Sequence, residues 1–266
     1  MTAWKEQEFL AKGETDGKII ILTDPVVERR GQKNNVRIRT ADLQAVRDIR
    51  EEGFSGCTAM RAVTLGRLQK LGKGAFSGCS KLREAILPPS LTYMGKAVFR
   101  DNRRLSTAFF DRNCPIRTIP ADSFSGCAAL QRVELPRHLR EIEDRAFYKC
   151  KELEELELPL SLKRIGREAF YNCGFRELEL PEGLVEIGEG AFRKCRNLEY
   201  IYLPDTLRKI GKWAFHGCTN LKVLEINHDP EEIGEWLTNK SCTIRCPKGS
   251  RMEEDARKYG MEVEYR

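Results

Sequence analysis

The ten cysteines are the residues of this 266-residue chain with the most evident capacity for chemistry. A thiolate can act as a nucleophile, bind zinc or form a disulfide. Zinc sites use close pairs such as Cys-x-x-Cys, whereas seven of these cysteines stand far apart in one phase of a long period: Cys57, Cys79, Cys127, Cys150, Cys173, Cys195 and Cys218. The spacing predicts a structural column of buried free thiols, in a chain with no metal site and no cofactor.

The other cysteines and the histidines offer no catalytic pair. Cys242 and Cys246 lie in one expected strand, about 13 Å apart if extended, and a disulfide needs Cα atoms within about 7 Å. Cys114 falls in an irregular stretch and is the best candidate for an exposed thiol. The three histidines are not at metal-ligand spacing from one another: His138, His216 and His228.

Two glutamates could form the carboxylate pair of an acid-base catalyst, Glu155 and Glu157. They are expected on an open sheet with no pocket to shift a pKa, so we do not expect an enzyme. Calcium coordination by a ladder of stacked glutamates is an alternative that stays open. Gly166, Gly188 and Gly211 share one phase and are interpreted as turn glycines, not as a phosphate-binding loop.

The cysteine column belongs to an internal repeat. A phenylalanine stands three residues before each of the seven cysteines, and an eighth, Phe99, is followed by Asn102 in the cysteine position. Such a fixed period indicates a solenoid, in which each turn buries its apolar edge against the next. Asn102 indicates that this position faces inward and satisfies backbone groups. The other phenylalanines are Phe54, Phe76, Phe124, Phe147, Phe170, Phe192 and Phe215.

One repeat, residues 147–170, shows the expected path of the chain. Leu156 and Leu158 alternate with glutamates, which is the pattern of a strand, and Pro159 ends that strand. Residues 162–166 then form a second short segment on the opposite wall. Phe170 fills the interior between turns.

The consensus Ala-Phe-x-x-Cys-x-x-Leu-x-x-Leu-x-Leu-Pro-x-x-Leu-x-x-Ile-Gly resembles the BspA-type leucine-rich repeats of bacteria and protists, over residues 36–250. The resemblance implies a repeat solenoid: a curved right-handed leucine-rich-repeat superhelix with a parallel concave β-sheet, short second strands or turns on the opposite wall, and capped ends. It also implies adhesion or protein binding and no shared catalytic residues.

We expect one domain in three parts: an N-terminal cap at residues 1–45, about eight repeats at 46–226 and a C-terminal cap at 227–266. In the first cap, residues 18–27 and 36–39 are expected to be strands around a loop, with Arg29 to Lys33 at a solvated hairpin tip; contact of this basic loop with an anion is the alternative. In the last cap, a strand at 243–247 precedes a helix at 251–259 that starts with the capping box Ser250 to Glu253 and stops at Gly260, and a strand at 261–264 follows.

The concave sheet face carries the candidate site. Its solvent-facing columns, in which we also place Glu225, hold an excess of glutamate over lysine and arginine, although the net charge of the chain is +6. Stacked carboxylates repel, and exposed aromatics beside charges are typical of binding hot spots. The expected binding residues are Ile86, Phe109, Glu134, Glu155, Glu157, Glu177, Glu179, Tyr200 and Tyr202. An extended insertion at 111–115 is expected at the rim of this sheet, as a binding loop or as drift.

The positive charge is expected on the opposite wall, which would give a basic back: Lys70, Arg140, Lys163, Arg164, Arg208 and Lys209. Three functions compete. The leading one is a non-enzymatic protein-protein interaction of a basic partner segment with the acidic sheet; the first alternative is a surface adhesin that binds a host protein or glycan. The second is nucleic acid or an anionic surface on the basic back, which lacks interleaved aromatics.

The expected location has two alternatives. No apolar leader is visible in residues 1–8 and no apolar run could span a membrane, which together with the thiols favours the cytoplasm. A cell-surface or secreted protein whose signal peptide was removed is the alternative that the resemblance favours.

Overall fold

The computed structural model describes residues 4–6 and 18–265, so the leader expectation falls largely outside the described residues. The chain forms two compact units. The first comprises Met1–Ile116 and Asp122–Pro136, and the second comprises Arg117–Ala121 and Arg137–Arg266. Each unit is a β-solenoid in which parallel strands from successive turns pair with each other, as the repeat predicts.

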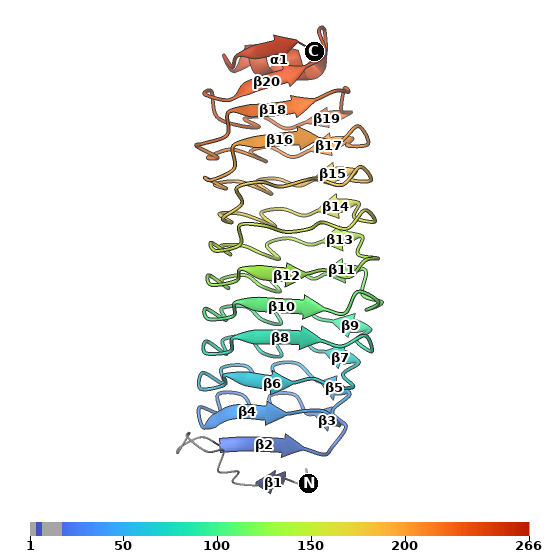
Figure 1. Cartoon of the computed structure of the whole chain (residues 1–266), viewed down its shortest axis with the longest axis vertical. Coiled ribbons are helices and arrows are strands. Elements are labelled where there is room, and N and C mark those ends of the chain that lie inside the picture. Colours follow the sequence, from blue (N-terminus) through green and yellow to red (C-terminus); the bar gives the residue numbers. More distant parts are fainter. Residues whose placement is uncertain (1–3, 7–17, 266) are drawn as a thin grey trace. The chain divides into compact units, whose positions relative to one another are not determined.

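The first unit has two walls, visible in the lower half of Figure 1. One wall holds longer strands in two sheets of order β1-β2-β4-β6 and β12-β10-β8, and the other holds short strands in the order β3-β5-β7-β9. Every pair is parallel except β1 with β2. The strands are β1 (Trp4–Glu6), β2 (Lys18–Leu22), β3 (Val26–Val27), β4 (Ile38–Asp42), β5 (Asp48–Ile49), β6 (Ala62–Thr64), β7 (Lys70–Leu71), β8 (Glu84–Leu87), β9 (Tyr93–Met94), β10 (Thr107–Phe110) and β12 (Arg132–Glu134).

The hairpin expected near the N-terminus is wrong. β2 and β4 pair in parallel, with Ile20 opposite Ala41, so residues 18–42 already make a turn of the solenoid. The basic loop is not a free tip, because Arg30 and Lys33 both bind Glu52 of the next turn, at 2.6 and 2.9 Å. These hydrogen bonds lower the pKa of Glu52 to about 2. The loop cations are therefore already neutralised.

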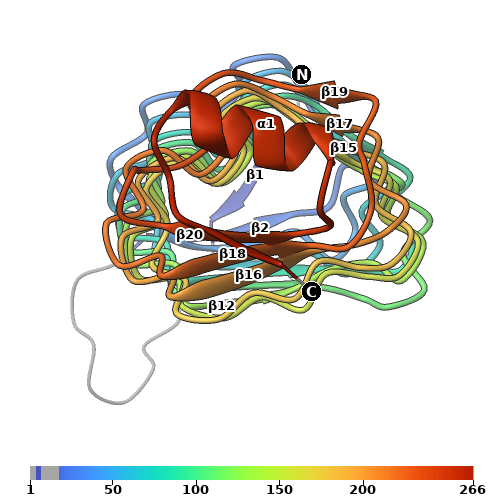
Figure 2. The ribbon, with the colours of Figure 1, turned by 90° about the horizontal axis from the view of Figure 1, so that it is seen from above.

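The second unit repeats this plan, with its two walls seen end-on in Figure 2. The short wall is one six-stranded sheet, β11-β13-β14-β15-β17-β19, and the other wall is the sheet β16-β18-β20-β21. All of these pairs are parallel. The elements are β11 (Thr118–Ile119), β13 (Glu141–Ile142), β14 (Arg164–Ile165), β15 (Glu186–Ile187), β16 (Tyr200–Leu203), β17 (Lys209–Ile210), β18 (Val223–Ile226), β19 (Glu232–Ile233), β20 (Thr243–Cys246), α1 (Arg251–Lys258) and β21 (Val263–Tyr265).

The interior of each unit is built from the repeated phenylalanine and cysteine. In the second unit the rings of Phe147, Phe170, Phe192 and Phe215 stack at centroid distances of 5.2 to 5.4 Å. Five of the repeat thiols donate to the carbonyl of the phenylalanine one turn earlier, as Cys195 Sγ does to Phe170 O at 3.2 Å. The thiols thus give these carbonyls a second donor besides the backbone amide three residues further on, as Cys173 N provides for Phe170 O at 3.3 Å.

The buried column of free thiols is confirmed, and all ten cysteines are free and buried. Asn102 also acts as predicted, because its Nδ2 donates to Phe76 O at 3.1 Å. The expectation that Cys114 is exposed is wrong. It is fully buried, and its thiol donates to Leu91 O at 3.3 Å, since the insertion folds its cysteine inward.

At the C-terminus α1 packs against β20 and β21. Ser250 caps the helix by accepting a hydrogen bond from the Glu253 amide at 3.2 Å. The Glu253 carboxylate accepts from the amide of Gly249 at 2.7 Å instead of the serine amide of a capping box. Met252 and Ala256 are the buried side of the helix.

Candidate interaction surfaces

The long-strand wall of the second unit is incomplete. The alternating segments at 154–158 and 176–180 were expected to be strands, and they are not: they join no sheet. Among the described residues, one backbone hydrogen bond links them, from Arg176 N to Glu154 O at 3.3 Å, and none links 176–180 to β16. Two edges therefore lie open where a continuous sheet would close them.

Two sequence features explain this opening. Pairing would stack Glu155 on Glu177 and Glu157 on Glu179 about 5 Å apart, and like charges placed directly opposite each other destabilise a sheet. The turn at Gly174 is also one residue shorter than its neighbours, and Phe175 replaces the leucine of other repeats. Phe175 is buried edge-on against Phe170, with ring centroids 5.4 Å apart, so a side chain larger than leucine occupies the core at this turn.

A groove of about 990 Å³ lies over the opening. Its lining brings together Glu177, Glu179, Tyr200 and Tyr202, which the sequence analysis proposed as binding residues. Glu155 and Glu157 are exposed on the adjoining segment and do not line it. The complete lining is Arg176, Glu177, Leu178, Glu179, Leu180, Glu182, Asn197, Glu199, Tyr200, Tyr202 and Asn220.

The charge of the groove is largely uncompensated. Arg176 is held by Glu154 at 3.1 Å, and Glu199 is held by Lys222 at 2.7 Å. Within the described part of the chain, no cation pairs with the three remaining acids of the lining: Glu177, Glu179 and Glu182. A cation that binds here would therefore not have to break an existing ion pair of these carboxylates.

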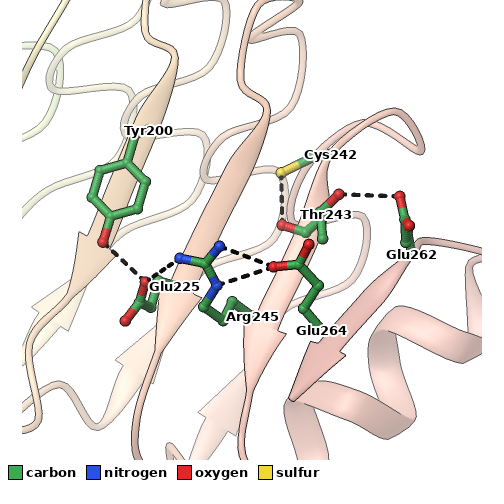
Figure 3. Close-up of polar contacts among 7 residues, drawn as sticks. All are labelled: Tyr200, Glu225, Cys242, Thr243, Arg245, Glu262 and Glu264. Carbon is green, nitrogen blue, oxygen red and sulfur yellow. Dashed lines mark hydrogen bonds and ion pairs between the residues drawn. The ribbon is translucent and has the colours of Figure 1, made fainter. Parts of the chain in front are cut away.

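The tyrosines at the groove are fixed by hydrogen bonds. The Tyr200 hydroxyl donates to Glu225 Oε2 at 3.1 Å, and Arg245 bridges Glu225 and Glu264 through contacts of 2.9 Å each (Figure 3). The expectation that Glu225 faces solvent is wrong: it is only 6% exposed, because Arg245 and Tyr200 cover it. No feature of the repeat pattern predicts this arrangement, since Arg245 lies in the expected cap.

Tyr202 stands beside Asp205, to which its hydroxyl donates at 3.1 Å. Burial and this carboxylate raise the pKa of Tyr202, so the ring presents a neutral hydroxyl. Tyr200 is 46% exposed. Both rings are therefore oriented before any partner arrives, which reduces the entropy lost on binding.

The first unit carries a separate patch. In the sheet of β8, β10 and β12, Phe109 lies directly opposite Ile86 on one side and Glu134 on the other. The Ile86 side chain is 57% exposed, and the Arg132 guanidinium lies 5.9 Å from the centre of the Phe109 ring. These three predicted residues are brought together, with Phe109 half-buried between its neighbours.

Half of the cations expected on the basic back form ion pairs with neighbouring turns. Arg164 binds both Glu141 and Glu186, and Lys209 binds Glu232 at 2.8 Å. Arg208 lies 3.7 Å from Glu231. Three of the six cations predicted there are thus matched by carboxylates one turn away, which makes the wall a weaker candidate for a polyanion than the sequence suggests.

Two further findings limit the chemistry of the described residues. No group of three or more His, Cys, Asp or Glu side chains is arranged to hold a metal ion, so the calcium ladder gains no support. No helix among them is long and apolar enough to cross a membrane. The insertion at 111–115 turns around Asp111, whose carboxylate accepts from the Asn113 amide at 2.8 Å, and it lies outside the groove lining.

Stacked parallel strands, an inward asparagine or cysteine, and short turns between two walls define a leucine-rich repeat protein. The BspA type leucine rich repeat region matches residues 33–153 and 117–245, in six copies. The chain belongs to this BspA-type leucine-rich repeat family, as its consensus predicts. Proteins of the family are generally interaction or adhesion proteins.

Solved structures with this fold cover nearly the whole chain. A leucine-rich repeat protein from Bacteroides ovatus is 18% identical, with a TM-score of 0.65, over 100% of this chain and 99% of the other. A leucine-rich repeat protein from T. pallidum is 25% identical, with a TM-score of 0.51, over 99% and 95%. No curated protein has a significant sequence match.

Proposed function

We propose that this chain is a non-enzymatic protein-binding protein, and that the groove of the second unit receives an extended basic segment of its partner. The observation that carries the proposal is the set of unpaired carboxylates beside an open strand edge. Glu177 and Glu179 present negative charge, and residues 176–180 leave backbone groups free to pair with an added strand.

The aromatic wall supports the same binding mode. Tyr200 and Tyr202 are large, rigid and hydrogen-bonded at one end, which is the composition of a binding hot spot. Glu155 and Glu157 would extend the negative field along the bound segment and raise the association rate. On the first unit, Ile86, Phe109 and Glu134 are proposed as a second contact. The groove would bind such a basic segment in the same way whether the partner lies in the cytoplasm or at the cell surface.

The test is selection of random peptides on the immobilised protein. We expect the selected peptides to alternate lysine or arginine with other residues and to bind less tightly as salt increases. Changing Glu177→Lys with Glu179→Lys should weaken binding by about 100-fold, because two charge pairs of about 1.5 kcal/mol each are lost.

A matched control carries the same change in net charge elsewhere, Glu235→Lys with Glu254→Lys, both exposed and outside the groove and the patch. This control should bind like the wild type. Selection of acidic or apolar peptides, or equal loss of binding in the control, would contradict the proposal. A third variant, Ile86→Ser with Phe109→Ser, measures whether the patch on the first unit contributes.

A further inference from the structure

A second hollow in the second unit has the opposite charge. It has a volume of about 500 Å³ and lies at the turn that contains Gly174. Four cations line it, Lys149, Lys151, Lys194 and Arg196, and its lining contains no carboxylate. None of the four forms an ion pair with any described residue, in contrast to the paired cations of the short-strand wall. Their charge is therefore available to a ligand.

The repeat explains how the hollow forms. Lys149 and Lys151 occupy one turn, Asn172 and Gly174 the corresponding positions of the next, and Lys194 and Arg196 those of the third. Because adjacent turns are about 5 Å apart, the two pairs of cations face each other across a space of about 10 Å. The middle turn supplies only an amide and a glycine without a side chain. The result is a gap between cations that a tetrahedral oxyanion would fill.

The backbone of this gap is fixed. Lys149, Asn172 and Lys194 all adopt positive φ, of 61°, 57° and 64°. Their amides donate to carbonyls of the following turn at 2.8 to 3.0 Å. In the first unit three of the corresponding positions are glycine, Gly56, Gly78 and Gly126, which adopts this conformation without strain, and a fourth is Asp101. Lysine at two such positions is unfavourable for the backbone, so its charge needs a reason other than stability.

An aromatic surface borders the cations. The rings of Tyr148 and Tyr171 are stacked, with centroids 4.8 Å apart. Lys149 Nζ lies 4.9 Å from the centre of the Tyr148 ring, and Lys194 Nζ lies 5.5 Å from that of Tyr171. These cation–π contacts orient both ammonium groups. They leave the N–H groups free to donate hydrogen bonds to a ligand, since the attraction is between the positive charge and the face of the ring.

We propose that this hollow is a binding site for a ligand with two neighbouring tetrahedral oxyanions, either phosphate or sulfate groups. Lys149 and Lys151 bind one side of the ligand, and Lys194 and Arg196 bind the other. Asn172 supplies a neutral donor between them. Four cations match the charge of two such groups, and the volume exceeds what a single ion needs. The hollow adjoins the acidic groove, because Asn197 lines both, but none of the four cations lines the groove.

The experiment is calorimetric titration of the full chain with pyrophosphate and, in a second arm, with a disulfated disaccharide. We expect saturable binding with one site per chain in at least one arm, and the stronger arm identifies the source of the oxyanion. Lys151→Gln with Arg196→Gln should weaken binding by at least about ten-fold, because two charge-assisted contacts are lost. The control, Arg140→Gln with Lys240→Gln, removes the same charge outside the hollow and should change binding less than about two-fold.

A second variant distinguishes loss of the binding site from loss of the fold. Lys149→Gly with Lys194→Gly suits the backbone conformation and removes two of the four cations, so it should fold and bind weakly. The proposal is overturned if neither arm shows saturable binding at millimolar concentration. It is also overturned if the folded variants bind as tightly as the control.

Discussion

Asn102 interrupts the thiol column, and replacing it tests what the column contributes. Its Nδ2 donates to Phe76 O at 3.1 Å, but its Oδ1 is buried and has no hydrogen-bond partner within the described residues. A cysteine at this position would donate to the same carbonyl, as Cys79 does to Phe54 O at 3.2 Å. Asn102→Cys therefore keeps the contact and removes the unsatisfied acceptor.

The magnitude follows from the two polar groups. An unsatisfied buried acceptor costs about 1–3 kcal/mol, and a thiol is a weaker donor than an amide. We expect Asn102→Cys to raise the free energy of unfolding by about 1 kcal/mol, or about 2–4 °C in Tm. Asn102→Ala removes the side-chain donor as well, leaves Phe76 O with only the Cys79 amide as its donor and opens a cavity, so it should destabilise by about 2 kcal/mol.

Thermal unfolding followed by circular dichroism gives the order of the three proteins, and hydrogen exchange at the amides of residues 99–105 gives the local effect. Neighbouring turns stabilise each other, so the exchange data should change most in the first unit. The reasoning is refuted if Asn102→Cys is less stable than the wild type. It is equally refuted if Asn102→Ala has no effect on either measurement.

Three further predictions follow from single groups. Lys194→Gly relieves a residue at φ 64° and should stabilise the protein by about 0.5–1 kcal/mol, the left-handed strain less the extra freedom of glycine when unfolded; a lower Tm would contradict this. Burial raises the pKa of Cys218 to about 12 and that of Cys242 to about 11, so near pH 8 these thiols stay protonated and should react with a thiol reagent only after unfolding. Rapid reaction of the native protein would show that a thiol is accessible. Hydrogen bonds from Gly249, Tyr265 and Arg257 lower the pKa of Glu253 to about 2, so its stabilisation is present above its ordinary value of 4.5 and is lost as the pH falls toward 2. Glu253→Gln should therefore melt below the wild type near pH 6 and together with it near pH 2, and an equal difference at both pH values would exclude the ionised form as the cause.

The sequence by itself determined the repeat and its interior. The phase of Phe170 and Cys173 predicts inward positions because a solenoid places each phase at one point of every turn. The inward position of Asn102 could be predicted in the same way, since its side-chain amide donates a hydrogen bond to a backbone carbonyl as the thiols do. The candidate binding positions also followed from phase, and the structure brings Glu177, Glu179 and both groove tyrosines together.

Only the tertiary structure decided which charges are free. The sequence places lysine and arginine on the short-strand wall, but whether Lys209 meets Glu232 depends on the register of neighbouring turns. Glu225 was predicted to be exposed because Arg245, which covers it, lies in the expected cap and outside the repeat phase. Cys114 was wrongly predicted to be exposed for a related reason. It lies in the insertion, which does not follow the repeat, so its inward position could not be predicted from the repeat phase.

The break in the long-strand wall of the second unit also could not be predicted from the sequence pattern. Residues 154–158 and 176–180 have the alternation of strands, and pattern alone predicts that they pair. Pairing is a property of two segments, and it is opposed here by stacked carboxylates and by the short turn at Gly174 with the bulky Phe175 behind it. The deletion is visible in the sequence, but its consequence, a groove on one side and a basic hollow on the other, depends on how three successive turns pack.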